Sequence, residues 1–121
     1  MNNILYNYDI NNSMRGSIMY VSTWMSTFTS NYNVVVNRFA VDDNRTKYTL
    51  AQWQALGKDL NSTLCLDANA LFVDQANKNF HLKSTSPAIN AGTTLADVTD
   101  DIDGEARPQG GGYDAGCYED F

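Results

Sequence analysis

The feature that most constrains the fold is a run of three valines at positions 34–36, which is closed by asparagine on both sides in the stretch "NYNVVVNRF" (31–39). A short aliphatic run between turn-forming residues is typical of a strand buried on both faces. Two neighbouring stretches, "ILYNYDI" (4–10) and "SIMYVSTWMSTF" (17–28), are rich in aromatic and β-branched residues or alternate in polarity. The sequence therefore predicts a mainly β fold built from short strands.

One helix is predicted, at residues 48–57. Thr49 is suited to the N-cap and Gln52 follows three positions later, which is the pattern of a capping box. Gly57 is placed to end the helix in the left-handed conformation. The apolar residues expected on one face are Leu50, Trp53 and Leu56. Because so short a helix is unstable alone, it must dock on the strands.

The charge of the chain is concentrated at its C-terminal end. Residues 97–121 carry eight Asp and Glu against Arg107 alone, a net charge of −7, while the whole chain has −6. An acidic protein without a basic stripe is a poor ligand for phosphates, so we expect no nucleic-acid partner. The first ten residues lack the features of a signal peptide, and no apolar run is long enough for a membrane span. We therefore expect a cytoplasmic protein without a membrane partner.

The two cysteines leave two interpretations open. Cys65 and Cys117 are far apart in the sequence, and they form either two reduced thiols or one disulfide. Of the two, we expect the reduced state, with both thiols partly buried.

Five stretches in a fixed order resemble the C-terminal end of right-handed parallel β-helix proteins of the pectate-lyase-like kind. They are "NYNVVV" (31–36), "YTLAQWQALGKDLNS" (48–62), "LFVD" (71–74), "NFHLKSTSPAINAG" (79–92) and "DIDGEARPQGGGYDAGCYE" (101–119). The segment "NNILYN" (2–7) is similar to one strand of a preceding coil. This family includes polysaccharide lyases, glycoside hydrolases and bacterial surface proteins, many of them secreted.

The resemblance implies a single domain over residues 1–121, with truncated β-helix-like coils and a capped C-terminal end. Its expected parts are coils at 1–47, the capping helix at 48–57, strands and turns at 58–96, and an acidic wrapping tail at 97–121. The residues expected to build the cap are Thr49, Gln52, Trp53, Arg107 and Asp114. Relatives carry many coils before this region. We therefore expect this chain to correspond to the C-terminal tail of such a protein without the preceding coils, as the product of a gene fragment or a mobile cassette.

An uncovered first coil would expose apolar side chains and an unpaired strand edge. We therefore expect a structural or interaction module that forms a homodimer or tetramer, with no catalytic function and no cofactor. The residues expected to mediate self-association are Ile4, Tyr6, Tyr8, Met19 and Val34.

Two alternatives to a structural module remain. Trp24, Tyr20 and Tyr32 are candidates for stacking on a carbohydrate, although they equally suit a core or an interface. Polysaccharide lyase or hydrolase activity ranks third, because no pair of carboxylates is placed on successive strands and the basic residues are scattered. The only histidine, His81, is expected to point outward from its strand.

The acidic tail is a weak candidate for calcium. Asp100, Asp101 and Asp103 supply oxygen ligands at close spacing, but not at the spacing of an EF-hand. The simpler interpretation is a turn whose negative charge is neutralised by Arg107. The guanidinium is then expected to make a bidentate contact with the carboxylate of Asp114 or Asp101. No other metal site is expected.

Overall fold

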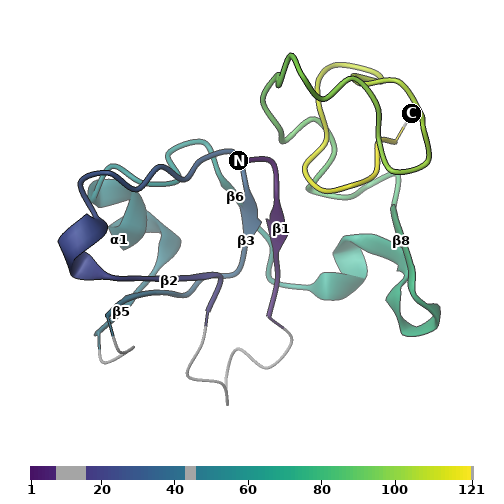
Figure 1. Cartoon of the computed structure of the whole chain (residues 1–121). Helices are drawn as coiled ribbons and strands as arrows, with labels where there is room; N and C mark the ends of the chain where they lie inside the picture. Colours follow the sequence, from purple (N-terminus) through teal and green to yellow (C-terminus); the bar gives the residue numbers. More distant parts are fainter. Residues whose placement is uncertain (8–15, 43–45, 121) are drawn as a thin grey trace.

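The structure is a computed structural model, and it describes residues 1–7, 16–42 and 46–120 (Figure 1). The described residues form eight short strands and one α-helix, so the chain is mainly β as predicted. The first sheet has three parallel strands in the order β1-β3-β6. These strands are β1 (Ile4–Leu5), β3 (Val34–Val35) and β6 (Thr63–Leu64).

The second sheet also has three strands, in the order β2-β4-β5. They are β2 (Ile18–Tyr20), β4 (Phe39–Val41) and β5 (Thr46–Tyr48). β2 pairs with β4 in parallel, whereas β5 pairs with β4 in the antiparallel direction. The parallel order therefore ends at β5.

After β6 the chain leaves the two sheets. β7 (Phe72–Asp74) and β8 (Asn79–Leu82) form an antiparallel hairpin. Short 3-10 helices occupy Ser22–Trp24, Ala68–Ala70 and Gln75–Asn77. After β8 the described chain winds into irregular loops up to residue 120 (Figure 1).

The helix α1 (Leu50–Ala55) confirms the predicted capping box. The Thr49 hydroxyl accepts a hydrogen bond from the Gln52 N–H at 3.2 Å, and the Gln52 Oε1 accepts one from the Thr49 N–H at 2.9 Å. Gly57 follows the helix with φ of +77°, which confirms its role in ending it. Leu56 does not share the buried face: it is the C-cap residue and is exposed, so that part of the prediction is wrong.

β3 separates two apolar cores. Val34 packs into the first core and Val35 into the second, because successive side chains of a strand point to opposite faces. Both valines are fully buried, which confirms the strand predicted from the three-valine run. The first core comprises Val34, Cys65, Leu71, Leu82, Ala88 and Ala115, and the second comprises Val35, Phe39, Leu50 and Trp53.

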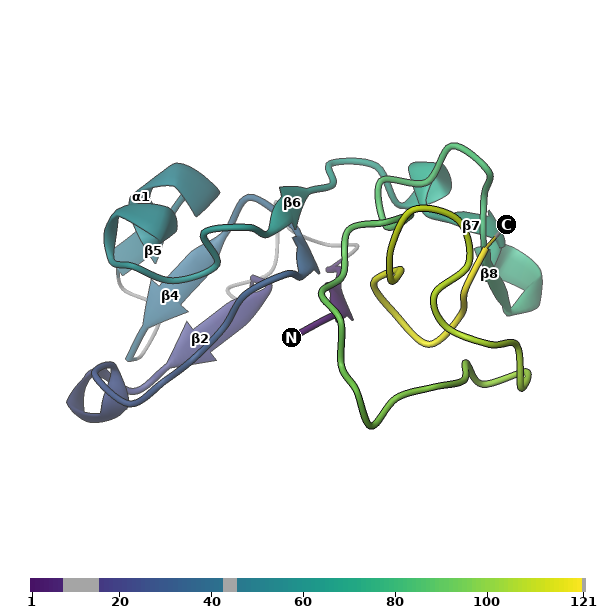
Figure 2. The same cartoon turned by 90° about the horizontal axis from the view of Figure 1, so that it is seen from above.

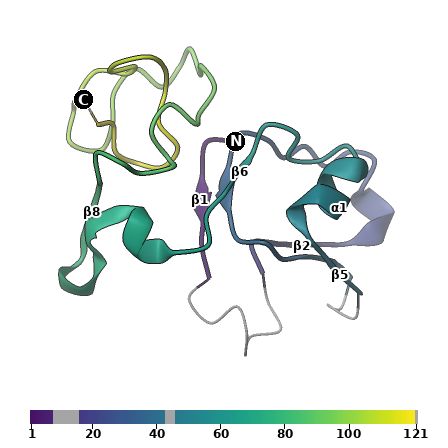
Figure 3. The same ribbon diagram turned by 180° about the vertical axis from the view of Figure 1, so that it is seen from behind.

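The two cores lie in two lobes on either side of the β1-β3-β6 sheet (Figure 3). One lobe contains α1, β2 and β5, and the other contains β8 and the C-terminal loops. Trp53 anchors α1 in its lobe, since its ring stacks on that of Phe39 with centroids 5.1 Å apart.

The predicted strands at the start of the chain are too long. β1 ends at Leu5, and residues 8–10 of the predicted strand lie outside the described residues. The stretch 17–28 is a strand only over β2, because the N–H of Ser22 donates to the side chain of Asp42 at 2.9 Å and a 3-10 helix begins there. Among the helices formed by described residues, none has the length and hydropathy of a membrane span.

Candidate functional site

The candidate site is an open strand edge. Within the described residues β1 pairs only with β3, and β2 pairs only with β4, so each is the edge strand of its sheet. In Figure 2, β2 and the purple segment that contains β1 lie on the same side of their sheets, opposite β6 and α1. Edge strands present unpaired backbone groups that readily pair with another chain.

An apolar hollow of about 690 Å³ lies on one side of β1, between this strand and the β7–β8 hairpin. Ile4 and Tyr6 line it from the N-terminal segment, and Phe72, Phe80 and Tyr118 line it from the hairpin and tail. We call it the hairpin-side hollow.

A second hollow, of about 430 Å³, lies between β1 and β2. Its apolar lining includes Leu5, Ile18, Met19, Tyr20 and Phe28. We call it the β2-side hollow. The two hollows share Asn3 and Leu5 in their linings, so both adjoin the β1 strand.

The residues predicted to mediate self-association have different environments. Met19 is 51% exposed on β2, at the open edge. Ile4 and Tyr6 are partly buried against the first core, and the Tyr6 hydroxyl accepts a hydrogen bond from the Ala68 N–H at 3.1 Å. Val34 is 0% exposed because β1 and β6 flank it, so its assignment to the surface is wrong. Tyr8 lies outside the described residues.

The three aromatic residues proposed for sugar stacking do not line one hollow. Trp24 is 62% exposed at the end of a 3-10 helix. Tyr20 lines the β2-side hollow and stacks on Phe28, with ring centroids 4.0 Å apart. Tyr32 is half-buried and absent from the linings of both hollows, and its carbonyl accepts a hydrogen bond from the Asn2 N–H. Trp24 is thus the only one of the three with a largely free ring.

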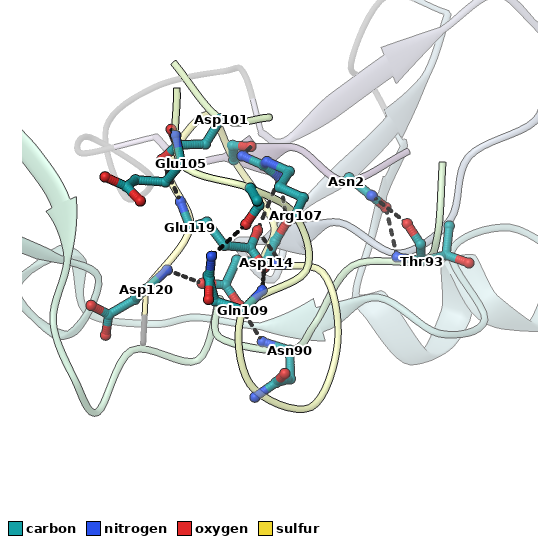
Figure 4. A network of polar contacts seen from close by, with 12 residues as sticks. Asn2, Asn90, Thr93, Asp101, Glu105, Arg107, Gln109, Asp114, Glu119 and Asp120 are labelled. Carbon is teal, nitrogen blue, oxygen red and sulfur yellow. Dashed lines mark hydrogen bonds and ion pairs between the residues drawn. The ribbon is translucent and has the colours of Figure 1, made fainter. Parts of the chain in front are cut away.

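A buried ion pair holds the acidic tail together (Figure 4). Nη1 of Arg107 lies 3.4 Å from Oε2 of Glu119. The guanidinium also donates to the carbonyl oxygens of Asp114 at 3.2 Å and Gly116 at 3.0 Å. Its carboxylate partner is therefore Glu119, and not Asp114 or Asp101 as the sequence predicted, because the fold brings the buried Glu119 side chain against the guanidinium and presents the backbone carbonyl of Asp114 to it.

The Asp114 carboxylate is fully buried and organises the loops around it. It accepts hydrogen bonds from the backbone N–H of Asn90 at 2.7 Å and of Asp120 at 2.8 Å. Burial raises the pKa of Asp114, and the charges of Glu119 and Asp120 act in the same direction, against the two backbone hydrogen bonds. Asp114 thus has a structural role at the centre of the tail.

The tail is tied to the start of the chain by Asn2. Its side chain donates to the carbonyl of Thr93 at 2.7 Å and accepts from the Thr93 N–H at 2.9 Å (Figure 4). Its own carbonyl accepts a hydrogen bond from the Gly116 N–H at 2.8 Å. The segment leading into β1 is therefore fixed against the C-terminal loops, although some 90 residues separate them.

Asp101 serves as an acceptor for the tail backbone. Its carboxylate accepts from the N–H groups of Asp103 at 2.8 Å, Glu105 at 2.9 Å and Glu119 at 3.0 Å. Burial, the largest single effect, acts to raise the pKa of Asp101. The three backbone hydrogen bonds and the charge of Arg107 outweigh it, so that the pKa lies below the ordinary value of 3.8.

The calcium candidates do not converge on a common point. Asp100 accepts a hydrogen bond from the Thr99 hydroxyl at 3.1 Å, and Asp103 lies 3.4 Å from Nε2 of His81. The Asp101 carboxylate accepts its hydrogen bonds from backbone N–H groups of the tail. Among the described residues no group of three side chains of the metal-binding types is arranged to hold an ion.

The surroundings of His81 were not predictable from its position in the sequence. Its ring packs against that of Tyr118, with centroids 4.2 Å apart, in addition to its contact with Asp103. The side chains of His81 and Asp103 are about half exposed, and ion pairs of this kind contribute little to stability. The outward orientation predicted for His81 agrees with its exposure.

The two cysteines are free thiols, which excludes a disulfide between them. Cys65 is buried in the first core, and burial raises its pKa. Cys117 is exposed and lines the hairpin-side hollow.

Comparison with known proteins assigns no family to this chain. No protein-family model, no curated protein and no solved structure matches it. A proposal about function therefore depends on the geometry of the open edge and its two hollows.

Proposed function

We propose that this chain is a structural, self-associating module that descends from the C-terminal end of a parallel β-helix protein. The observation that carries the proposal is that β1 and β2, from two different sheets, are both edge strands and lie on the same side of those sheets, opposite β6 and α1. Self-association covers these two edges.

The spacing of the parallel strands supports the β-helix origin. Ile4 pairs with Val34, and Val34 pairs with Thr63, so the strand recurs after 30 and then 29 residues. Parallel strands that recur at a nearly constant interval are expected of stacked coils, each of which buries its faces against its neighbours. At the other end of the second sheet, the antiparallel strand β5 ends the parallel order.

The exposed apolar surface supports self-association. Met19 is half exposed on β2, the hairpin-side hollow is lined mainly by apolar side chains, and the β2-side hollow has apolar and polar side chains together. An uncovered edge with apolar hollows beside it favours pairing with another chain. A symmetric dimer or tetramer covers such edges without forming fibres, and obligate interfaces of this kind bury on the order of 2,000 Å² or more.

Sedimentation velocity over a dilution series tests the proposal. The parent chain should sediment as a dimer or tetramer at micromolar concentration, and Met19→Lys should shift it toward the monomer, because a charge on an edge strand opposes pairing. Val73→Lys is the matched control: Val73 is 50% exposed on a strand, and it lines neither hollow. A folded parent that remains monomeric throughout the series would contradict the proposal.

Carbohydrate binding without catalysis is the second candidate, and the exposure of Trp24 favours it. A free indole ring offers an apolar face to a sugar. A glycan array would detect binding by the parent chain, and Trp24→Ala should abolish it without changing the melting temperature. Binding that survives this substitution would remove Trp24 from the hypothesis.

A further inference from the structure

We infer that the C-terminal loops, residues 88–120, act as a strap that holds β1 in its sheet. When this strap opens, β1 detaches with it, while the lobe that contains α1 stays folded. The inference concerns the opening of one part of the fold and goes beyond the proposed function. Only its consequence for assembly rests on the proposed function, because β1 is one of the two edges that self-association covers.

The strand β1 is too short to be held by its own ladder. It consists of Ile4 and Leu5, and within the described residues it pairs on one side only, with β3. Strands in globular proteins usually have about 3–10 residues, and shorter pairings are marginal alone. Two hydrogen bonds from Asn3 to the side chain of Asn33 extend the contact, but Asn3 is exposed to water. Further contacts must therefore hold β1 in place.

The strap supplies these contacts, and most of them meet at Asn2 (Figure 4). The Asn2 side chain makes two hydrogen bonds with the backbone of Thr93, and its carbonyl accepts one from the Gly116 N–H. Asn2 is buried and has a φ of +60°, a left-handed conformation that is costly unless its surroundings hold it. Ile4 lies so close to Gly116 that a Cβ on this glycine would be 3.0 Å from the isoleucine Cδ1. The strap thus fixes both the residue that leads into β1 and a side chain of the strand itself.

Buried polar groups, and not regular secondary structure, keep the strap closed. The guanidinium of Arg107 pairs with Glu119 and donates to the carbonyl of Gly116, the residue whose N–H reaches Asn2. A buried polar network that loses one member leaves the others unsatisfied in a medium of low dielectric constant, so it opens as a unit. A continuous series of contacts therefore runs from Glu119 through Arg107 and Gly116 to Asn2.

The lobe that contains α1 has anchors of its own. The ring of Trp53 stacks on Phe39, and its Nε1 donates to the Asp59 carboxylate, which also accepts from the side chain of Asn33 just before β3. This core buries two large aromatic rings, whereas the strap contributes Ala88 and Ala115 to the first core. Because burial of apolar area dominates stability, the lobe with the larger rings opens at the higher free energy.

Opening of the strap has two consequences. Ala88, Ala115 and Ile4 leave the first core, which exposes the buried thiol of Cys65. Loss of β1 from the sheet also removes one of the two edges of the proposed interface. The strap therefore links the burial of this thiol to assembly.

Native-state hydrogen exchange tests the inference on the Met19→Lys chain, whose added charge opposes self-association. The Val34 N–H reports on β1, since it donates to the backbone of that segment at 2.8 Å, and the N–H groups of Ala115 and Gly116 report on the strap. The N–H groups of Trp53 and Thr63 report on the other lobe. In low guanidinium, the first three amides should share one opening constant, larger than that of the last two by about tenfold or more. A Val34 amide that exchanges together with Trp53 and Thr63, or independently of the strap, would overturn the inference.

Thiol labelling tests the same opening from the far end of the series of contacts. In a Cys117→Ser background Cys65 is the single thiol, and iodoacetamide reaches it when the first core opens. Arg107→Met should speed its labelling by about tenfold or more, while the Trp53 amide stays protected. Lys78→Met, at an exposed lysine, is the matched control. Equal labelling rates in the two variants would contradict the role of the strap.

Asn2→Ala provides a second variant, which serves even if Arg107→Met does not fold. It breaks the link between the strap and β1 and leaves the buried ion pair intact. The Val34 amide should then exchange about tenfold or more faster than before, and faster than that of Ala115, because β1 no longer follows the strap. Unchanged exchange at Val34 would overturn the inference.

Failure of the inference is distinguishable from failure of the proposed function. Exchange and labelling are read within one chain, and they decide the role of the strap whether the parent chain assembles or not. Under the proposed function, Arg107→Met should in addition sediment as a smaller species than Lys78→Met. A parent chain that sediments as a monomer contradicts self-association and leaves the exchange test of the strap unchanged.

Discussion

Arg107 and Glu119 form an ion pair that is almost completely removed from water: Nη1 and Oε2 are 3.4 Å apart, and the two side chains are 4% and 0% exposed. The Glu119 carboxylate also accepts hydrogen bonds from the N–H of Gln109 at 2.9 Å and of Asp114 at 3.2 Å. The pair therefore links the loop that contains the arginine to the last residues of the described chain.

Loss of this arginine should destabilise the protein strongly. Arg107→Met leaves the Glu119 carboxylate buried without its cation, and breaking a buried pair in this way costs about 3–5 kcal/mol. Chemical denaturation measures the loss, with Lys78→Met as the control, because Lys78 is exposed. A double-mutant cycle with Glu119→Gln should give a positive coupling energy. Equal stabilities of Arg107→Met and the control would mean that the pair does not hold the tail.

Stability should depend on the ionisation of Asp101. A carboxyl whose pKa is lower in the folded state stabilises the protein above its unfolded pKa, and this contribution is lost as the pH falls through the folded value. Asp101→Asn should therefore be less stable than the parent at pH 7, and the difference should shrink below about pH 4. Urea denaturation at several pH values measures both, with Asp97→Asn as the exposed control. A gap that is constant with pH would contradict the ionic role of Asp101.

The hydrogen bond between Trp53 and Asp59 should stabilise the second core. Nε1 of Trp53 donates to the buried Asp59 carboxylate at 2.9 Å. Trp53→Phe keeps an aromatic ring but removes the donor, and should cost about 1.5–3 kcal/mol. Trp53→Ala also removes the ring and should cost about 3–5 kcal/mol.

The other tryptophan supplies the control. Trp24→Phe changes an exposed ring and should alter stability by no more than about 0.5 kcal/mol. Equal effects of the two phenylalanine substitutions, measured by guanidinium denaturation, would show that the Asp59 contact contributes nothing.

Calcium should leave the melting temperature unchanged. A ligand that binds only the folded state raises its stability as the ligand concentration increases, but Asp100, Asp101 and Asp103 are turned toward separate protein partners. Differential scanning fluorimetry with and without millimolar calcium measures the effect, and magnesium serves as the comparison. A rise in melting temperature that follows the calcium concentration and disappears in Asp101→Asn would identify a calcium site in the tail.

Local interactions in the sequence determined the helix and the central strand. The capping box of Thr49 and Gln52 spans three residues, and Gly57 ends the helix through its own backbone freedom. The valine run at 34–36 is buried because a strand so rich in aliphatic residues gains most by covering both faces. These features were predictable since each depends on residues that are close together in the chain.

Tertiary structure alone decided the partners of the polar residues and the ends of most strands. The contact of Asn2 with Thr93 joins residues 91 positions apart, and Arg107 has several acidic residues within reach in the sequence, of which Glu119 becomes its buried partner. The hydrogen bonds from Asn3 to the side-chain oxygen of Asn33 likewise follow from the pairing of β1 with β3, 30 residues away. No local pattern specifies such pairs, because the free energy that selects them comes from the burial of groups that meet only when the whole chain has folded.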